Sequence, residues 1–188
     1  MDWWISGHKA TIKSLEDNEL KYFANIRHWT YLQENYVYTW SVRWINFAWH
    51  SFDFTIYWDT HLNTFCSVLQ EYKTNWYNNF VVAHWWTEYQ YLTHNKTQET
   101  EWKKLIDCWA DLVIWWHPHV IQDVERYNWK PIIYNSLGNF LFDQDWSENT
   151  QKWIWILIDY KENGEISFET EERNVAVKKE DWRDIEGE

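Results

Sequence analysis

Short apolar runs alternate with amphipathic segments along most of this chain. Residues 80–83 form a continuous apolar run that suits a buried strand. Residues 97–108 place apolar side chains at helical spacing, with Glu and Lys on the opposite face, and a second apolar run follows at 111–114. A strand, a helix and a strand of these lengths predict a βαβ unit with parallel strands and a right-handed crossover.

The remaining periodic segments predict further elements around this unit. Residues 8–20 and 62–72 have the spacing of helices. We expect strands at residues 36–42, 44–50, 120–127, 131–135, 153–161 and 165–172. The dipeptide Asn163-Gly164 is the strongest hairpin signal in the chain. We find no repeat or linker, so we expect one domain over residues 1–172 and a charged tail over 173–188.

The charge of the chain is strongly acidic, with 29 Asp and Glu against 17 Lys and Arg. Such a field repels phosphate backbones and argues against nucleic acid as a partner, whereas it attracts metal cations. Cys66 and Cys108 are far apart in sequence and predict neither a disulfide framework nor a zinc motif. No apolar run has the length of a membrane span, and residues 1–20 lack the layout of a signal peptide.

The tryptophan content is abnormal, because the chain has 19 Trp and only 4 Gly. Two tryptophans stand where turn chemistry favours glycine. Trp129 follows Asn128 between two predicted strands, where Asn-Gly is the expected hairpin turn. Trp109 follows the predicted helix at the position that glycine usually takes. A bulky residue at positive φ is costly, so these positions conflict with the local structure that their neighbours predict.

Three histidines follow the two strands of the βαβ unit. His84 comes directly after the first strand, and His117 and His119 come after the second. The carboxyl ends of parallel strands lie at one edge of a sheet, where ligands bind, so we expect the three imidazoles to meet at a metal site. A lone histidine is more often a surface or hydrogen-bonded residue than a metal ligand. The three histidines do not identify the metal. Zinc, iron and manganese, with carboxylate help, all suit them.

Four segments around these histidines are long enough to compare with known motifs. They read HWWTEY from His84, LIDCWAD from Leu105, VIWWHPHV from Val113 and YNSLGNF from Tyr134. In this order they resemble the HWGxEY, LIDxGAD, VIGxHPHV and YSLGNFxFDQ motifs of the bacterial CapA family of capsule synthesis, which carries a PGA_cap domain and is linked to poly-γ-glutamate. The resemblance runs from about residue 80 to 160, and residues 1–79 resemble the family only loosely.

This resemblance implies a fold and a site. The family is similar to calcineurin-like metallophosphatases, so we expect an α/β, metallophosphoesterase-like β-sandwich flanked by helices, with this chain as the C-terminal portion. His84, His117 and His119 match histidine ligands of a site that holds two divalent metal ions. Glu88 and Asn139 match motif positions near that site and are candidate catalytic residues. The alternatives are that Glu88 caps a loop and that Asn139 holds a turn.

The chain departs from the family in two respects. The earlier ligand motifs of the family, which include an Asn-Asn-His loop, have no counterpart here. We therefore expect an N-terminally truncated domain, with Asp2 as a remnant beside the site. In addition, tryptophan stands where the family has glycine at positions 86, 109, 115, 116 and 129. Our hypothesis is that UGA codons meaning glycine have been read as tryptophan.

The function that the resemblance implies is capsule or poly-γ-glutamate biosynthesis or processing. The chemistry expected is metal-dependent hydrolysis, in which two metal ions activate a water for attack on a phosphoryl or similar group. The expected partners are an anionic polymer or phosphoester substrate and a membrane-bound synthesis complex at the extracytoplasmic face. One alternative is a non-catalytic assembly component with a vestigial metal site. Another reads the tryptophans as sugar-stacking platforms, which requires Trp115 and Trp116 to be exposed.

Overall fold

The computed structural model describes residues 3–21, 37–54, 59–84, 87–133, 137–139 and 146–174. Its elements in chain order are α1 (Trp3–Asp17), β1 (Val37–Val42), β2 (Ile45–Asp53), α2 (Asp59–Thr74), β3 (Tyr77–His84), α3 (Lys96–Asp107), β4 (Leu112–Trp116), β5 (Val124–Tyr127), β6 (Lys130–Ile133), η2 (Glu148–Gln151), β7 (Lys152–Tyr160) and β8 (Ile166–Asn174). Among the described residues, none of these helices is long and apolar enough to span a membrane.

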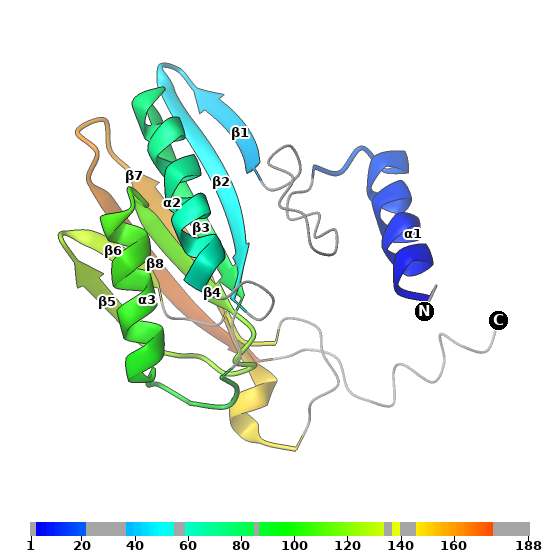
Figure 1. The fold of residues 1–188 in the computed structure, drawn as a ribbon. Coiled ribbons are helices and arrows are strands. Elements are labelled where there is room, and N and C mark those ends of the chain that lie inside the picture. The colour runs from blue at the N-terminus through cyan, green and yellow to red at the C-terminus, as the bar shows by residue number, and fades with distance from the viewer. Residues whose placement is uncertain are drawn as a thin grey trace.

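A six-stranded sheet forms the centre of the structure, with strand order β1-β2-β3-β4-β6-β5 (Figure 1). The four inner strands β2, β3, β4 and β6 are parallel, and the edge strands β1 and β5 are antiparallel to their neighbours. The predicted βαβ unit is confirmed as β3–α3–β4, with Phe80 opposite Leu112 and Ala83 opposite Trp115. The predicted hairpin around Gly164 is confirmed as β7–β8, which forms a separate two-stranded sheet.

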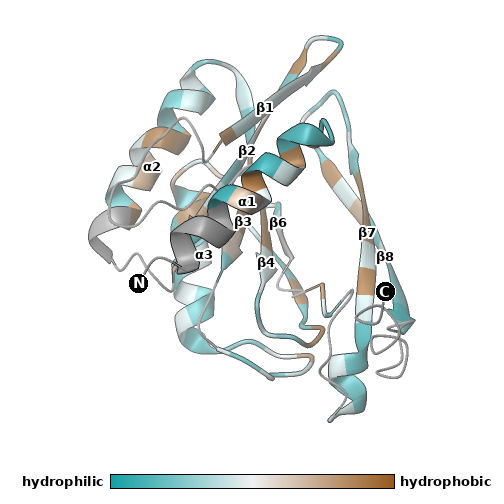
Figure 2. Ribbon diagram, turned by 90° about the vertical axis from the view of Figure 1, so that its right-hand side faces the viewer, coloured by the Kyte–Doolittle hydropathy of each residue, from teal (hydrophilic) through white to brown (hydrophobic). Residues whose placement is uncertain are grey.

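Alternating residues of the central strands face two different cores. On one face, Val81 and Val113 pack against residues of α2 and α3. On the other face, Phe80 and Leu112 pack against apolar side chains of β7 and β8. Helices therefore cover one face of the large sheet and the β7–β8 sheet covers the other, as Figures 1 and 2 show. The α/β class and the arrangement of two sheets flanked by helices are confirmed, with α2 and α3 on one side only.

A disulfide joins the two helices that cover the sheet. Cys66 of α2 and Cys108, which follows α3, are bonded, with their Cα atoms 5.0 Å apart. The sequence-based expectation of no disulfide was wrong. The two cysteines are separated by 42 residues in the chain, but both helices pack on the same face of parallel strands, and this brings their ends together.

The ends of the chain fit the predictions less well than its centre. Helix α1 begins at Trp3 rather than at residue 8, and Leu20, expected on its buried face, lies beyond the helix and is 56% exposed. Strand β8 continues to Asn174, two residues into the predicted tail, and the rest of that tail lies outside the described residues.

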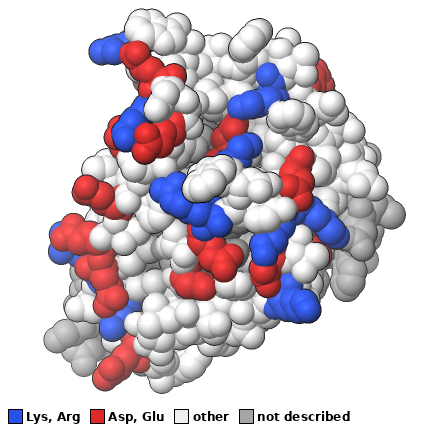
Figure 3. Space-filling model, turned by 90° about the vertical axis from the view of Figure 1, so that its left-hand side faces the viewer, with Lys and Arg blue, Asp and Glu red and all other residues white. Residues whose placement is uncertain are grey.

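On the face in Figure 3, acidic and basic side chains are interspersed, despite the net charge of −12.

Among the described residues, three tryptophans have backbone conformations that favour glycine. Trp109 has φ of 82°; its N–H donates to the Ile106 carbonyl and the next N–H to that of Leu105, the pattern of a helix end that glycine usually completes. Trp129 has φ of 67° and, with Asn128 at 49°, makes the two-residue turn between β5 and β6. Trp76, after α2, has φ of 66°. The conflict predicted at positions 109 and 129 is therefore present in the backbone.

Replacement of Trp129 by glycine is expected to stabilise the protein. The side chain is 93% exposed, so little packing is lost, while the strain at positive φ is relieved. We expect the free energy of unfolding to rise by about 1 kcal/mol in urea denaturation. The matched control is Trp155→Gly in β7, where the side chain is also exposed but the backbone is extended, and where we expect a loss of stability. Equal effects of the two substitutions would contradict this explanation.

Stability is expected to fall at acidic pH because of His50. This residue is fully buried in β2, where its Nε2 lies 3.0 Å from Asn79 Oδ1, and burial lowers its pKa to about 4 from 6.5. The unfolded chain therefore binds a proton between pH 6.5 and 4 that the folded chain does not, so stability is lost as pH falls through this window. We expect His50 to contribute a loss of about 3 kcal/mol. The measurement is urea denaturation at pH 7 and pH 4, and a His50→Gln variant should lose less stability over this range.

Candidate metal centre

The predicted site lies at the carboxyl edge of the parallel strands. His84 is the last residue of β3, and His117 and His119 follow β4 directly. Glu88 belongs to the segment between β3 and α3. Two backbone hydrogen bonds hold this segment against the segment after β4: Tyr89 N donates to Pro118 O and Leu92 N donates to Ile121 O, both at 2.9 Å. The parallel pairing of β3 and β4 thus brings together side chains that are more than thirty residues apart.

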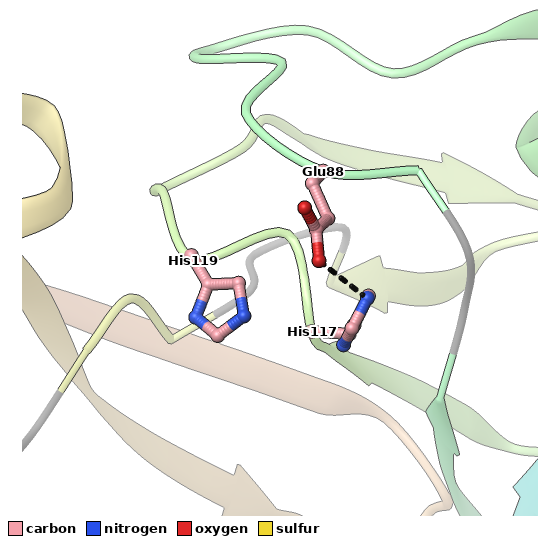
Figure 4. Close-up of side chains that lie close together, drawn as sticks. All are labelled: Glu88, His117 and His119. Atoms are coloured by element: carbon pink, nitrogen blue, oxygen red, sulfur yellow. Dashed lines mark ion pairs between the residues drawn. The ribbon is translucent and has the colours of Figure 1, made fainter. Parts of the chain in front are cut away.

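Three of the predicted residues form a cluster that could hold a cation. One donor atom from each of Glu88, His117 and His119 lies within 4.8 Å of the other two. Glu88 Oε1 is 3.2 Å from His117 Nε2, the ion pair drawn in Figure 4, and His119 lies beside this pair. Two imidazoles and a carboxylate are a ligand set that zinc, iron and manganese accept. The side chains are partly exposed, so an ion could reach them from solvent.

His84 lies beside the cluster and contacts it through His117. Its Nε2 is 2.9 Å from His117 Nδ1, and the centroids of the His84 and Trp116 rings are 4.9 Å apart. Its Nδ1 is 3.2 Å from Asp53 Oδ2. Asp53 was not predicted as a site residue. The sequence carried no signal for it, because its place beside His84 follows from the parallel pairing of β2 with β3.

Asn139 contacts a histidine of the cluster and lies outside the cluster itself. Its Oδ1 is 2.8 Å from His119 Nδ1, and its Nδ2 donates to the Thr150 carbonyl at 2.9 Å. The Thr150 carbonyl fixes the orientation of the amide, so the amide oxygen faces His119 and accepts from Nδ1–H. The lone pair of His119 is then on Nε2. This geometry lets Asn139, which is buried, orient His119, and its catalytic role stays a prediction.

The backbone and electrostatics of His117 are unusual. His117 has φ of 111° and His119 has φ of 59°, conformations that cost energy in residues other than glycine and that often occur at functional sites. Burial lowers the pKa of His117, and the neighbouring His84 lowers it further, whereas Glu88 raises it. The net lowering favours the neutral imidazole, the form that binds metal ions.

The sequence-based alternative of sugar stacking requires both Trp115 and Trp116 to be exposed. Trp115 is fully buried and stacks on Trp102, whereas Trp116 is 54% exposed. Sugar stacking by both residues is therefore excluded. Asp2 and Trp86 lie outside the described residues.

Residues 70–144 match the family described as bacterial capsule synthesis protein PGA_cap. This region, which is less than half of the chain, is similar to that family. The match includes all five predicted site residues and ends before β7, so it is shorter at its C-terminal side than the resemblance predicted from the motifs.

Two curated relatives come from the genus Bacillus. The PGA biosynthesis protein CapA of Bacillus subtilis (strain 168) is 36% identical over 91 residues, which cover 47% of this chain and 23% of that protein. The capsule biosynthesis protein CapA of Bacillus anthracis is 34% identical over 97 residues, which cover 50% of this chain and 22% of that protein. The aligned residues thus span less than a quarter of each relative.

Among solved structures, a Staphylococcus aureus protein described as a 5′-nucleotidase, in complex with alpha-ketoglutarate, is similar over 80% of this chain and 32% of its own length. The TM-score is 0.47 and the sequence identity is 12%.

Proposed function

We propose that this protein acts in the biosynthesis or processing of a capsule polymer such as poly-γ-glutamate and that it uses a metal site of the metallophosphatase type. The observation that carries the proposal is the cluster of Glu88, His117 and His119 at the carboxyl edge of parallel strands, within the region that matches PGA_cap. The names of the two Bacillus relatives support the capsule role.

The donor atoms of the cluster fit a divalent ion. Two imidazoles and one carboxylate would hold it, and His84 would hold the His117 ring through its Nδ1. A bound divalent ion would supply positive charge that stabilises the charge developing on a phosphoryl or similar group. Asn139 would hold His119 with its Nε2 lone pair available for the ion, and Glu88 would either bind the ion or accept a proton from water.

The substrate that this site favours is a phosphoester or another anionic group of a polymer, and we propose no nucleic-acid partner. The acidic chain, with its net charge of −12, needs a cation at the site to attract an anionic substrate. We also propose an extracytoplasmic location beside a membrane-bound synthesis complex. The Cys66–Cys108 disulfide supports this location, because disulfides form and persist in oxidising compartments.

Metal binding and hydrolysis test the proposal together. We expect the purified protein to bind Mn²⁺ or Zn²⁺ in calorimetric titration and to hydrolyse p-nitrophenyl phosphate only when the ion is present. His117→Ala should weaken metal binding at least tenfold and abolish the metal-dependent hydrolysis, because it removes a central donor. The measurements are the dissociation constant and the initial rate of nitrophenol release.

The matched control is His94→Ala. His94 is a partly buried histidine that pairs with Asp123 at 2.9 Å and packs on Trp102, outside the cluster, so its loss should leave metal affinity unchanged. A protein that binds the ion but hydrolyses nothing would support the non-catalytic assembly role instead of the enzyme. A protein that binds no divalent ion would contradict the metal site.

A further inference from the structure

We propose that Asp53 positions the metal site from outside it by fixing which nitrogens of His84 and His117 carry hydrogen. The inference rests on the proposed function, since it concerns the same cluster. It adds a residue from a third strand, β2. It also explains why the cluster would bind a cation rather than form a hydrogen bond between His117 and Glu88.

The first step is the contact between Asp53 and His84. Asp53 is 6% exposed at the end of β2, and its Oδ2 lies 3.2 Å from His84 Nδ1. The backbone fixes this pair, because Phe54 N donates to the His84 carbonyl at 2.9 Å. An ionised carboxylate can only accept, so the neutral His84 imidazole must carry its hydrogen on Nδ1. Its Nε2 then has the lone pair.

In the second step, the position of the hydrogen on His84 determines its position on His117. His84 Nε2 lies 2.9 Å from His117 Nδ1, a distance at which one nitrogen must donate and the other accept. Because His84 Nε2 holds a lone pair, His117 Nδ1 must carry the hydrogen. The lone pair of neutral His117 is therefore on Nε2.

The third step concerns Glu88. We call the series of contacts from Asp53 through His84 to His117 the relay. His117 Nε2 lies 3.2 Å from Glu88 Oε1, so the relay places the Nε2 lone pair opposite a carboxylate oxygen. They repel unless a cation or a proton lies between them, and this makes the cluster receptive to a metal ion. In the reversed relay, His117 Nε2–H would donate to Glu88 and close the site. The reversed relay would set the Asp53 carboxylate against the Nδ1 lone pair of His84. Asp53 disfavours this arrangement more strongly than Glu88 disfavours the forward one, because the Asp53 side chain is 7% exposed and the Glu88 side chain is 39% exposed, so water solvates Glu88 better.

Replacement of Asp53 by Asn tests this role. An amide can donate to His84 Nδ1, so Asp53→Asn permits the reversed relay with almost no change in side-chain volume. We expect ¹⁵N chemical shifts of the imidazoles in the metal-free protein to show a change of tautomer in His84 and His117. We also expect the affinity for Mn²⁺ to fall by about 10- to 100-fold.

The matched control is Asp111→Asn. Asp111 is 8% exposed at the amino end of β4, with ion pairs to Lys73 at 2.8 Å and Lys130 at 3.1 Å. Its replacement should lower stability without changing the histidine tautomers or the Mn²⁺ affinity. Unchanged tautomers in Asp53→Asn would overturn the relay. Failure of the unsubstituted protein to bind Mn²⁺ would instead contradict the proposed function, because the tautomer measurement needs no metal.

A different observation, independent of the metal site, carries a second inference. We infer that the native protein has glycine at positions 76, 109 and 129. All three residues have φ between 66° and 82°, and their side chains are 85%, 48% and 93% exposed. The sequence motifs do not point to glycine at position 76, so the inference there comes from the backbone alone. Trp76 N donates to the Lys73 carbonyl at the end of α2, as a residue after a helix does.

Peptide sequencing by mass spectrometry of the protein isolated from its own organism tests this inference. We expect glycine at positions 76, 109 and 129 and tryptophan at position 102, which is fully buried within α3 and stacks on Trp115. Tryptophan at the three turn positions would overturn the inference. Glycine at position 102 as well would contradict the assignment by backbone conformation.

Discussion

The parallel pairing of β3 with β4 is the constraint on which the candidate site depends. Its register sets Ala83 opposite Trp115 and His84 opposite Trp116, so the residues that leave the two strands start from the same edge of the sheet. A shift of one residue would turn Val81 and Val113 away from the helices and His84 away from His117. The same pairing therefore determines both the core and the position of the histidines.

Contacts at both ends of the strands stabilise the pairing of β3 with β4. At the amino end, Asp111 accepts from the Asn79 backbone N–H and pairs with Lys73 of α2 and Lys130 of β6. At the carboxyl end, the Tyr89 N–H donates to the Pro118 carbonyl, which joins the segments that follow the two strands. The disulfide between α2 and the end of α3 closes the helical layer over these strands. His84 and His117 therefore lie at strand ends, whereas Glu88 and His119 come from the connecting segments.

Local patterns predicted the strands and the gathering of the histidines, because both depend on hydrophobic periodicity and on the topology of one βαβ unit. The contacts of Asp53 and Asn139 could not be predicted in the same way. Each depends on the distance between side chains from segments far apart in sequence, and β2 gave no sign of its place beside β3 until the sheet order was known. The disulfide was missed for the same reason, since Cys66 and Cys108 meet only after two helices have packed.

The tryptophans show how sequence and backbone can disagree within one well-formed fold. The turns at Trp109 and Trp129 keep their hydrogen bonds and strand register despite side chains that favour other conformations, because the neighbouring residues determine those turns. Asn128 supplies one positive φ of the hairpin, and Leu105 and Ile106 supply the carbonyls that end the helix. The three tryptophans at positive φ stand where their neighbours agree with the fold, and this indicates a difference in residue identity rather than a difference in structure.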